Sequence, residues 1–199
     1  MTATISAEQV KQLRDMTGAG MMECKKALSE TGGDLDKAVD ELRKSGIAKA
    51  EKRADRSASQ GRVDTYIHDN RIGVLIEVNC ETDFVARTDD FKNLCKDLAM
   101  QAAAAHAQYT RREEVPAERI AREKDIYAAQ LANEGKPANM MEKILEGKLN
   151  KFYAEVCLME QMFIKDDKKS IDTLVKETSM KTGENIVVRR FVRFVLGQE

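Results

Sequence analysis

Residues 72–87 read IGVLIEVNCETDFVAR and join a nearly continuous apolar run to the start of a helix. The run Ile72–Asn79 predicts a well-buried strand. Before it, residues 63–68 alternate in type and predict a first strand, with Asp69–Arg71 as the turn of a β-hairpin. After it, Thr82 is a suitable N-cap. The stretch therefore predicts a strand-to-helix unit within an antiparallel sheet.

The turn Thr82–Val85 has two interpretations. In the first, Thr82 caps the helix, Asp83 lies favourably in its first turn, and Phe84 packs down onto the protein. In the second, Phe84 and the neighbouring carboxylate point outward as a binding probe, because turns held by rigid elements often display functional side chains. Residue preferences alone favour the first interpretation.

The chain after this turn predicts further helices and one more strand. Apolar residues at helical spacing (Phe91, Leu94, Cys95, Leu98 and Ala102) extend the helix that begins at Thr82. Additional helices are predicted over Ala117–Asn133, Met140–Val156 and Ser170–Lys181, with Gly135–Pro137 separating the first two. Alternation over Ile186–Leu196 predicts a closing strand that pairs with the hairpin far away in sequence.

The first 45 residues predict three short helices. The first covers Ala7–Met16, with Val10, Leu13 and Met16 on its apolar face. The second covers Met21–Thr31. The third begins after Asp34 as its N-cap and ends at Ser45–Gly46. The pattern, especially over residues 31–39, resembles the ubiquitin-associated three-helix fold.

These patterns predict an α+β protein with three parts. Residues 1–46 form the small three-helix domain, residues 47–60 form a basic linker, and residues 61–199 form an antiparallel sheet covered by helices. The stretch from Arg43 to Arg56 is rich in arginine and lysine. It is interpreted as a solvated linker helix or as an electrostatic handle for an acidic partner. It has no interleaved aromatic residue on which a base could stack, so direct nucleic-acid binding is not expected.

Composition narrows the class of protein further. Of 199 residues, 42% are hydrophobic and 34% charged, and the formal net charge is −1, without the basic excess of a dedicated nucleic-acid binder. No apolar run reaches the ~20 residues of a membrane span, and the N-terminal residues show no secretory signal pattern. A cytoplasmic protein with no membrane contact is expected. Its scattered cysteines (Cys24, Cys80, Cys95 and Cys157) predict reduced thiols and no metal site.

No motif of catalysis or cofactor binding is present. His68 and His106 lie outside any recognised catalytic pattern, and Gly18 with Gly20 lacks the strand context of a dinucleotide site. Three hypotheses remain open at this level: a regulator that binds another protein, a module of the ubiquitin-associated type that uses the helical head alone, and an unrecognised enzyme that uses one of the histidines. The protein is expected to be no enzyme and to need no cofactor.

Two long segments resemble the elongation factor Ts family. They are LRDMTGAGMMECKKAL over residues 13–28 and EVNCETDFVA over residues 77–86. Gly135–Pro137 and then Glu146–Tyr153 resemble the family's later helical region, and the order and spacing agree over nearly the whole chain. The resemblance implies a guanine-nucleotide exchange factor that binds elongation factor Tu and promotes release of GDP, so that GTP can enter.

The resemblance also implies which residues act. Asp83 and Phe84 would push into the GTPase domain of the partner near its magnesium site, with Thr82 and Val85 setting the geometry of the tip. Four residues of the head, Leu13, Arg14, Met21 and Met22, would dock on the same domain. The long form of the family carries two related core subdomains, whereas this chain has one. The short form therefore implies a homodimer in which two single cores replace the doubled core.

Overall fold

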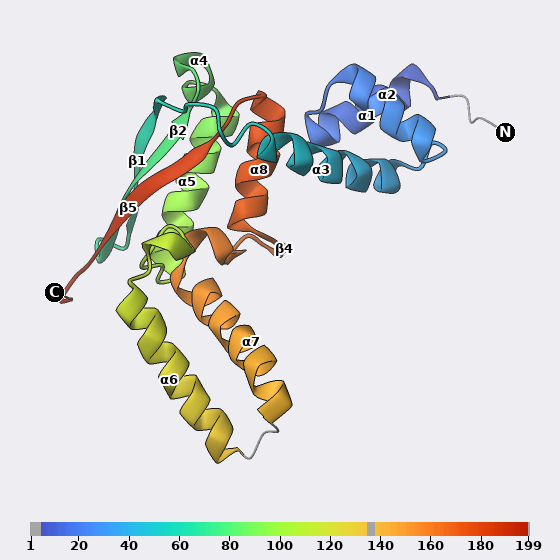
Figure 1. Cartoon of the computed structure of the whole chain (residues 1–199). Coiled ribbons are helices and arrows are strands. Elements are labelled where there is room, and N and C mark those ends of the chain that lie inside the picture. Colours follow the sequence, from blue (N-terminus) through green and yellow to red (C-terminus); the bar gives the residue numbers. More distant parts are fainter. Residues whose placement is uncertain (1–4, 135–137, 199) are drawn as a thin grey trace. The chain divides into compact units, whose positions relative to one another are not determined.

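The computed structural model describes residues 5–134 and 138–198, and it confirms the predicted α+β class (Figure 1). The predicted break at Gly135–Pro137 lies outside the described residues. The chain forms two compact units. The first takes in the chain up to Arg62 together with Val78–Cys95 and Thr173–Val187. The second consists of Val63–Glu77, Lys96–Asp172 and the chain from Val188 onward.

Three helices form the N-terminal head: α1 (Ala7–Thr17), α2 (Met21–Glu30) and α3 (Leu35–Glu51). Ser6 begins α1 with a capping box, and Gly18 ends it in a left-handed conformation, where glycine lacks the steric penalty of a side chain. As predicted, Asp34 caps α3, accepting a hydrogen bond from the Lys37 amide at 3.1 Å. The core of the head consists of Val10, Leu13, Ala19, Cys24, Ala27, Leu28, Ala38 and Leu42.

Helix α3 does not end at Ser45–Gly46, which corrects the predicted end of this helix. It continues to Glu51. Gly46 is buried against Met180, and a Cβ at this position would lie 2.0 Å from the Met180 sulfur. The glycine therefore permits a close approach of α3 to the helix α8 (Ile171–Thr182), and is not a helix stop. A packing glycine and a terminating glycine look the same in sequence.

The sheet has the strand order β1 (Gln60–His68), β2 (Ile72–Cys80), β5 (Val187–Val195). Asp69 and Asn70 both have positive φ, at 47° and 55°, as a tight hairpin turn requires. The predicted hairpin is therefore confirmed, and so is a closing strand beside β2. In β2 the side chains of Val74, Ile76, Val78 and Cys80 are buried, as expected for the central strand.

The helix predicted from Thr82 onward is two helices, α4 (Asp83–Ala86) and α5 (Asp89–Ala104). They are separated because the Thr88 hydroxyl accepts a hydrogen bond from the Phe91 amide at 3.3 Å, so that Thr88 starts a new helix. The predicted apolar stripe of α5 is buried.

The remaining helices of the sequence prediction are confirmed as α6 (Ala117–Asn133), α7 (Ala138–Val156) and α8. Between α7 and α8 the structure adds a short two-stranded sheet, β3 (Met162–Phe163) with β4 (Asp166–Ser170). Asp166 and Asp167 begin β4. No helix among the described residues has the length and hydropathy needed to cross a membrane.

Candidate partner-binding site

The turn Thr82–Val85 lies between the end of β2 and the single-turn helix α4, and we call these four residues the tip. Thr82 has extended backbone angles (φ −126°, ψ 156°), and its hydroxyl accepts a hydrogen bond from the Val85 amide at 3.4 Å. The capping role predicted for Thr82 is therefore confirmed. Val85 is half-buried and Ala86 is buried, so one side of α4 packs against the protein.

Phe84 does not pack down, and the first interpretation is wrong on this point. Its side chain is 79% exposed. Asp83 is half-buried and forms an ion pair of 2.8 Å with Arg87, one helical turn later. The tip therefore presents a bare aromatic ring beside a carboxylate that is held in place. Sequence reasoning did not identify Arg87, although its i, i+4 spacing from Asp83 is a signal for such a pair.

A second carboxylate holds the start of the tip from the turn that follows α8. The Glu81 and Thr82 amides both donate to Glu184 Oε2 at 3.0 Å, and the Thr82 hydroxyl donates to Oε1 at 2.6 Å. In return the Asn185 amide donates to Glu81 Oε1 at 2.7 Å. Sequence reasoning missed Glu184, because it lies far from Thr82 along the chain and no local pattern marks it.

The thiol of Cys80 lies directly before the tip. It is buried and donates to the Thr82 carbonyl at 3.1 Å. Burial, and next the charge of Glu184, raise its pKa to about 11. Because only the thiolate is a strong nucleophile, Cys80 is chemically quiet near neutral pH and serves as packing. The four cysteines are all buried and free of disulfides, as the sequence predicted.

The head presents part of the predicted docking set. Arg14, Met21 and Met22 are exposed, with Met22 at 76%. Leu13 is fully buried in the helical core, so it supports this surface from beneath. Met16, which we expected on the buried face, is 54% exposed. It lies near the end of α1, just before the turn that leads to Met21 and Met22 at the start of α2.

The basic stretch from Arg43 to Arg56 is used within the first unit. Arg43 pairs with Glu177 of α8 at 2.9 Å, Lys49 pairs with Glu23 of α2, and Arg56 lies 3.5 Å from Glu81. The Lys49 ammonium holds the pKa of Glu23 below its usual value. Arg43, Lys49 and Arg56 therefore form ion pairs with acidic residues of the same unit.

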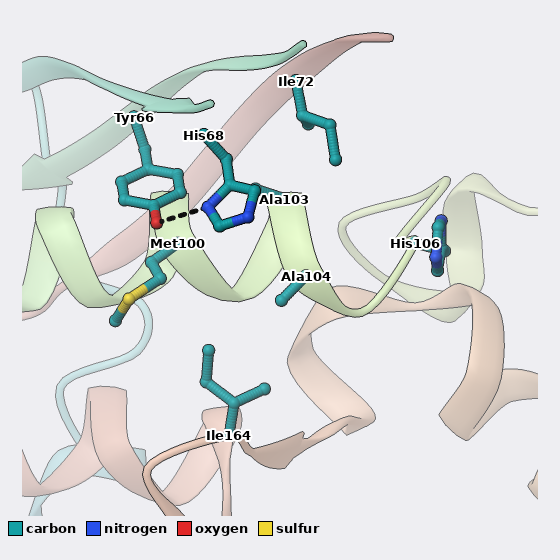
Figure 2. A pocket seen from close by; sticks show the side chains of 8 residues that line it. All are labelled: Tyr66, His68, Ile72, Met100, Ala103, Ala104, His106 and Ile164. Carbon is teal, nitrogen blue, oxygen red and sulfur yellow. Dashed lines mark hydrogen bonds between the residues drawn. The ribbon is translucent and has the colours of Figure 1, made fainter. Parts of the chain in front are cut away.

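A separate hollow of about 420 Å³ in the second unit is lined by both histidines (Figure 2). The Tyr66 hydroxyl lies 3.2 Å from His68 Nδ1, while His106 stands apart at the end of α5 beside Arg193. The rest of the lining is aliphatic or methionine. Within the described residues, no group of three or more potential metal ligands occurs. No carboxylate is among the residues that line the hollow, and the Asp69 carboxylate that lies 3.6 Å from His68 Nε2 belongs to the exposed hairpin turn.

The chain is similar to proteins of one family over nearly its whole length. A family model described as Elongation factor TS matches residues 3–198. The chain is 60% identical over 196 residues to the protein named elongation factor Ts of Geobacter sulfurreducens, covering 98% of this chain and 91% of that protein. The corresponding protein of Heliobacterium modesticaldum is 57% identical over 195 residues, with the same coverages. That of Thermoanaerobacter sp. is 56% identical over 195 residues, covering 98% and 96%.

Proposed function

The chain belongs to the elongation factor Ts family, and from this premise we propose that it binds elongation factor Tu and promotes the release of GDP through its tip. It is an exchange factor and no enzyme, since it changes no covalent bond. The family match extends from the head through the core. A binding module of the ubiquitin-associated type would use the head alone and leaves most of that match unexplained.

The exposure of Phe84 is the observation that carries the proposal. A phenylalanine side chain that is 79% exposed contributes little to the stability of the folded protein. Aromatic side chains do, however, supply much of the binding energy of protein interfaces. Asp83 beside it is fixed by Arg87 at 2.8 Å. When the tip enters the GTPase domain near its magnesium site, the ring occupies space and the carboxylate competes for cations. Both effects weaken the hold on the β-phosphate of GDP.

Exchange then follows from linked binding equilibria. The factor needs to bind nucleotide-free partner much more tightly than GDP-bound partner, and the reciprocal effect lets incoming nucleotide displace the factor. Each tenfold change in nucleotide affinity corresponds to ~1.4 kcal/mol of coupling. The tip supplies the interactions that are stronger with the nucleotide-free partner than with the GDP-bound partner. The head supplies binding that does not depend on the nucleotide.

The exposed side chains of the head are suited to docking on the same GTPase domain. Methionine is flexible and polarisable, so Met16, Met21 and Met22 can adapt to a partner surface, and Arg14 adds a charge at its border. Leu13 lies in the buried core that holds together the two helices carrying these side chains. This division of labour gives Leu13 a structural role in docking and leaves direct contact to its exposed neighbours.

The second unit carries a surface suited to a second copy of the chain, which supports a homodimer. Six exposed apolar side chains lie on the three strands or at their ends: Val63, Ile67, Leu75, Val192, Phe194 and Leu196. A Cβ at Gly73 would lie 3.4 Å from Ile67, so neighbouring strands β1 and β2 share this face. A contiguous apolar face of this kind marks an interaction site. A two-fold axis would let the same face cover itself in both copies.

Release of a fluorescent GDP analogue from elongation factor Tu tests the proposed function. Catalytic amounts of the chain should accelerate the release, and excess unlabelled GDP should compete with the factor for the partner. A release rate that stays unchanged with micromolar factor would refute the assignment. The same assay without magnesium is informative, since the acceleration should shrink when the metal is already absent.

A further inference from the structure

The carboxylate of Glu184 accepts three hydrogen bonds, two from the first residue of the tip and one from the residue before it. It accepts from the Glu81 and Thr82 amides and from the Thr82 hydroxyl. We propose that Glu184 is a positioning residue for exchange. It fixes the peptide group from which Asp83 and Phe84 project, and thereby the direction in which they enter the partner. This inference rests on the proposed function of the tip.

Helix α4 is too short to fix this direction by itself. It has four residues, a single turn, and an isolated turn of helix is unstable because nucleation costs more conformational entropy than one hydrogen bond returns. Its capping bond from the Val85 amide to the Thr82 hydroxyl is long, at 3.4 Å, whereas the same hydroxyl donates to Glu184 at 2.6 Å. The exposed Phe84 ring adds little packing. An external support is therefore required.

Glu184 is itself held firmly. Gly183 ends α8 in a left-handed conformation, with its amide donating to the Ser179 carbonyl at 2.9 Å. The Ser179 hydroxyl donates to the Glu184 carbonyl, and Arg53 donates to the Ser179 carbonyl at 3.3 Å. The carboxylate is thus presented from an anchored turn. Hydrogen bonds to a charged acceptor are also shorter and stronger than neutral ones.

Glu81 and Asn185, the neighbours of Thr82 and Glu184, also bond to each other, so the two turns hold each other in both directions. Glu81 accepts from the Asn185 amide at 2.7 Å, while the Asn185 side chain donates to the Ala54 and Arg56 carbonyls at 3.1 and 2.8 Å. The segment after α3, the turn after α8 and the start of the tip are therefore joined by side-chain hydrogen bonds. Removal of the Glu184 carboxylate breaks its three hydrogen bonds with Glu81 and Thr82 and leaves the Asn185 bonds in place.

Two substitutions at Glu184 separate positioning from general stability. Glu184→Ala should slow GDP release by about tenfold or more, equivalent to ~1.4 kcal/mol. Hydrogen exchange of the Glu81 and Thr82 amides should accelerate, while the amides of the head core keep their protection. Glu184→Gln should restore most of the activity. Its amide oxygen can accept from both backbone amides, and its NH₂ group can donate to the Thr82 hydroxyl.

Glu177→Ala is the matched control, because Glu177 is also a glutamate of the α8 region and pairs with Arg43 of α3 at 2.9 Å. It should lower thermal stability about as much as Glu184→Ala does, yet leave GDP release unchanged. If Glu184→Ala fails to fold, Glu184→Asp takes its place. The charge and the turn remain, but the shorter side chain does not reach the amides. The Glu81 and Thr82 amides should therefore again lose protection from hydrogen exchange, and GDP release should again be slower.

Two results would overturn the inference: normal GDP release by Glu184→Ala with unprotected Glu81 and Thr82 amides, or amides that stay protected without the carboxylate. Failure of the proposed function is distinguishable. In that case the unaltered protein would not accelerate GDP release at all, whereas the hydrogen-exchange comparison needs no partner and still reports whether Glu184 holds the tip.

Discussion

Arg87 holds the carboxylate of Asp83 at 2.8 Å across one turn of α4, while Phe84 between them is 79% exposed. The charge is satisfied within the tip and the ring is left to solvent. Stability and function are therefore separable at this turn, because the exposed ring stabilises the fold little. The following expectations use this separation and others like it.

The double substitution Asp83→Ala with Phe84→Ala should slow GDP release from elongation factor Tu by about tenfold or more, the ~1.4 kcal/mol of one lost anchor. The free energy of unfolding should change by about 0.5 kcal/mol or less, because exposed positions contribute little. Stopped-flow exchange and thermal unfolding measure the two quantities. Ile126→Ala, another exposed apolar position, is the control and should alter neither. Normal exchange by the double variant would remove the tip from the mechanism.

Leu13→Ala and Met22→Ala should have opposite profiles. Leu13 is fully buried, so its truncation leaves a cavity and should cost about 2–5 kcal/mol of stability. Met22 is 76% exposed, so its truncation should leave stability nearly unchanged and weaken binding of elongation factor Tu. Chemical denaturation and titration calorimetry give the two profiles. A stable Leu13→Ala variant with weakened binding would show that Leu13 contacts the partner directly.

Two helical glycines should respond in opposite directions to alanine. At Gly46 a methyl group would collide with Met180, so Gly46→Ala should destabilise the protein by about 1–3 kcal/mol. At Gly147, in α7, a Cβ would meet nothing within 4 Å, so Gly147→Ala should stabilise by about 0.5–1 kcal/mol through helix propensity. Denaturant midpoints compare the pair. Equal effects of the same sign would mean that Gly46 is not a packing glycine.

Phe194→Asp should shift the protein from dimer to monomer. The side chain is 70% exposed on the proposed dimer face, and a charge there would be buried without a partner on association. Sedimentation velocity over a range of concentrations measures the mass. Ile164→Asp is the control, since Ile164 is exposed in the second unit but outside that face, and its mass distribution should match the unaltered protein. A single-chain mass for the unaltered protein at high concentration would exclude the dimer.

Stability should decrease as the pH rises from about 9 to about 11. Burial raises the pKa of the Cys80 and Cys157 thiols to about 11 from their ordinary value of 9.0. The unfolded chain therefore loses these protons first. The stabilisation is complete below pH 9 and is lost as the pH approaches 11, by about 1.4 kcal/mol per pH unit for each thiol. Denaturation of Cys80→Ala over this range should show a shallower slope, and an unchanged slope would mean that Cys80 ionises freely.

Local patterns were sufficient for most of the secondary structure. The hairpin followed from alternation and the Asp69–Asn70 turn, and α6 was predicted with both of its ends. Each depends on residues close together in sequence. The errors at Gly46 and Thr88 share another cause, because a glycine or a threonine can end, cap or pack a helix, and a distant neighbour determines which. For Gly46 that neighbour is Met180, on a helix near the other end of the chain.

The sequence by itself determined that residues 72–87 form a central strand leading into a capped turn, because Thr82 needs only its own neighbours to cap. The direction of Phe84 was decided by tertiary structure alone, since packing inward and pointing outward satisfy the same local pattern. The support under the tip was decided in the same way. Glu184 reaches Thr82 from a turn far along the chain, and only the folded backbone brings its carboxylate within 3.0 Å of the Thr82 amide.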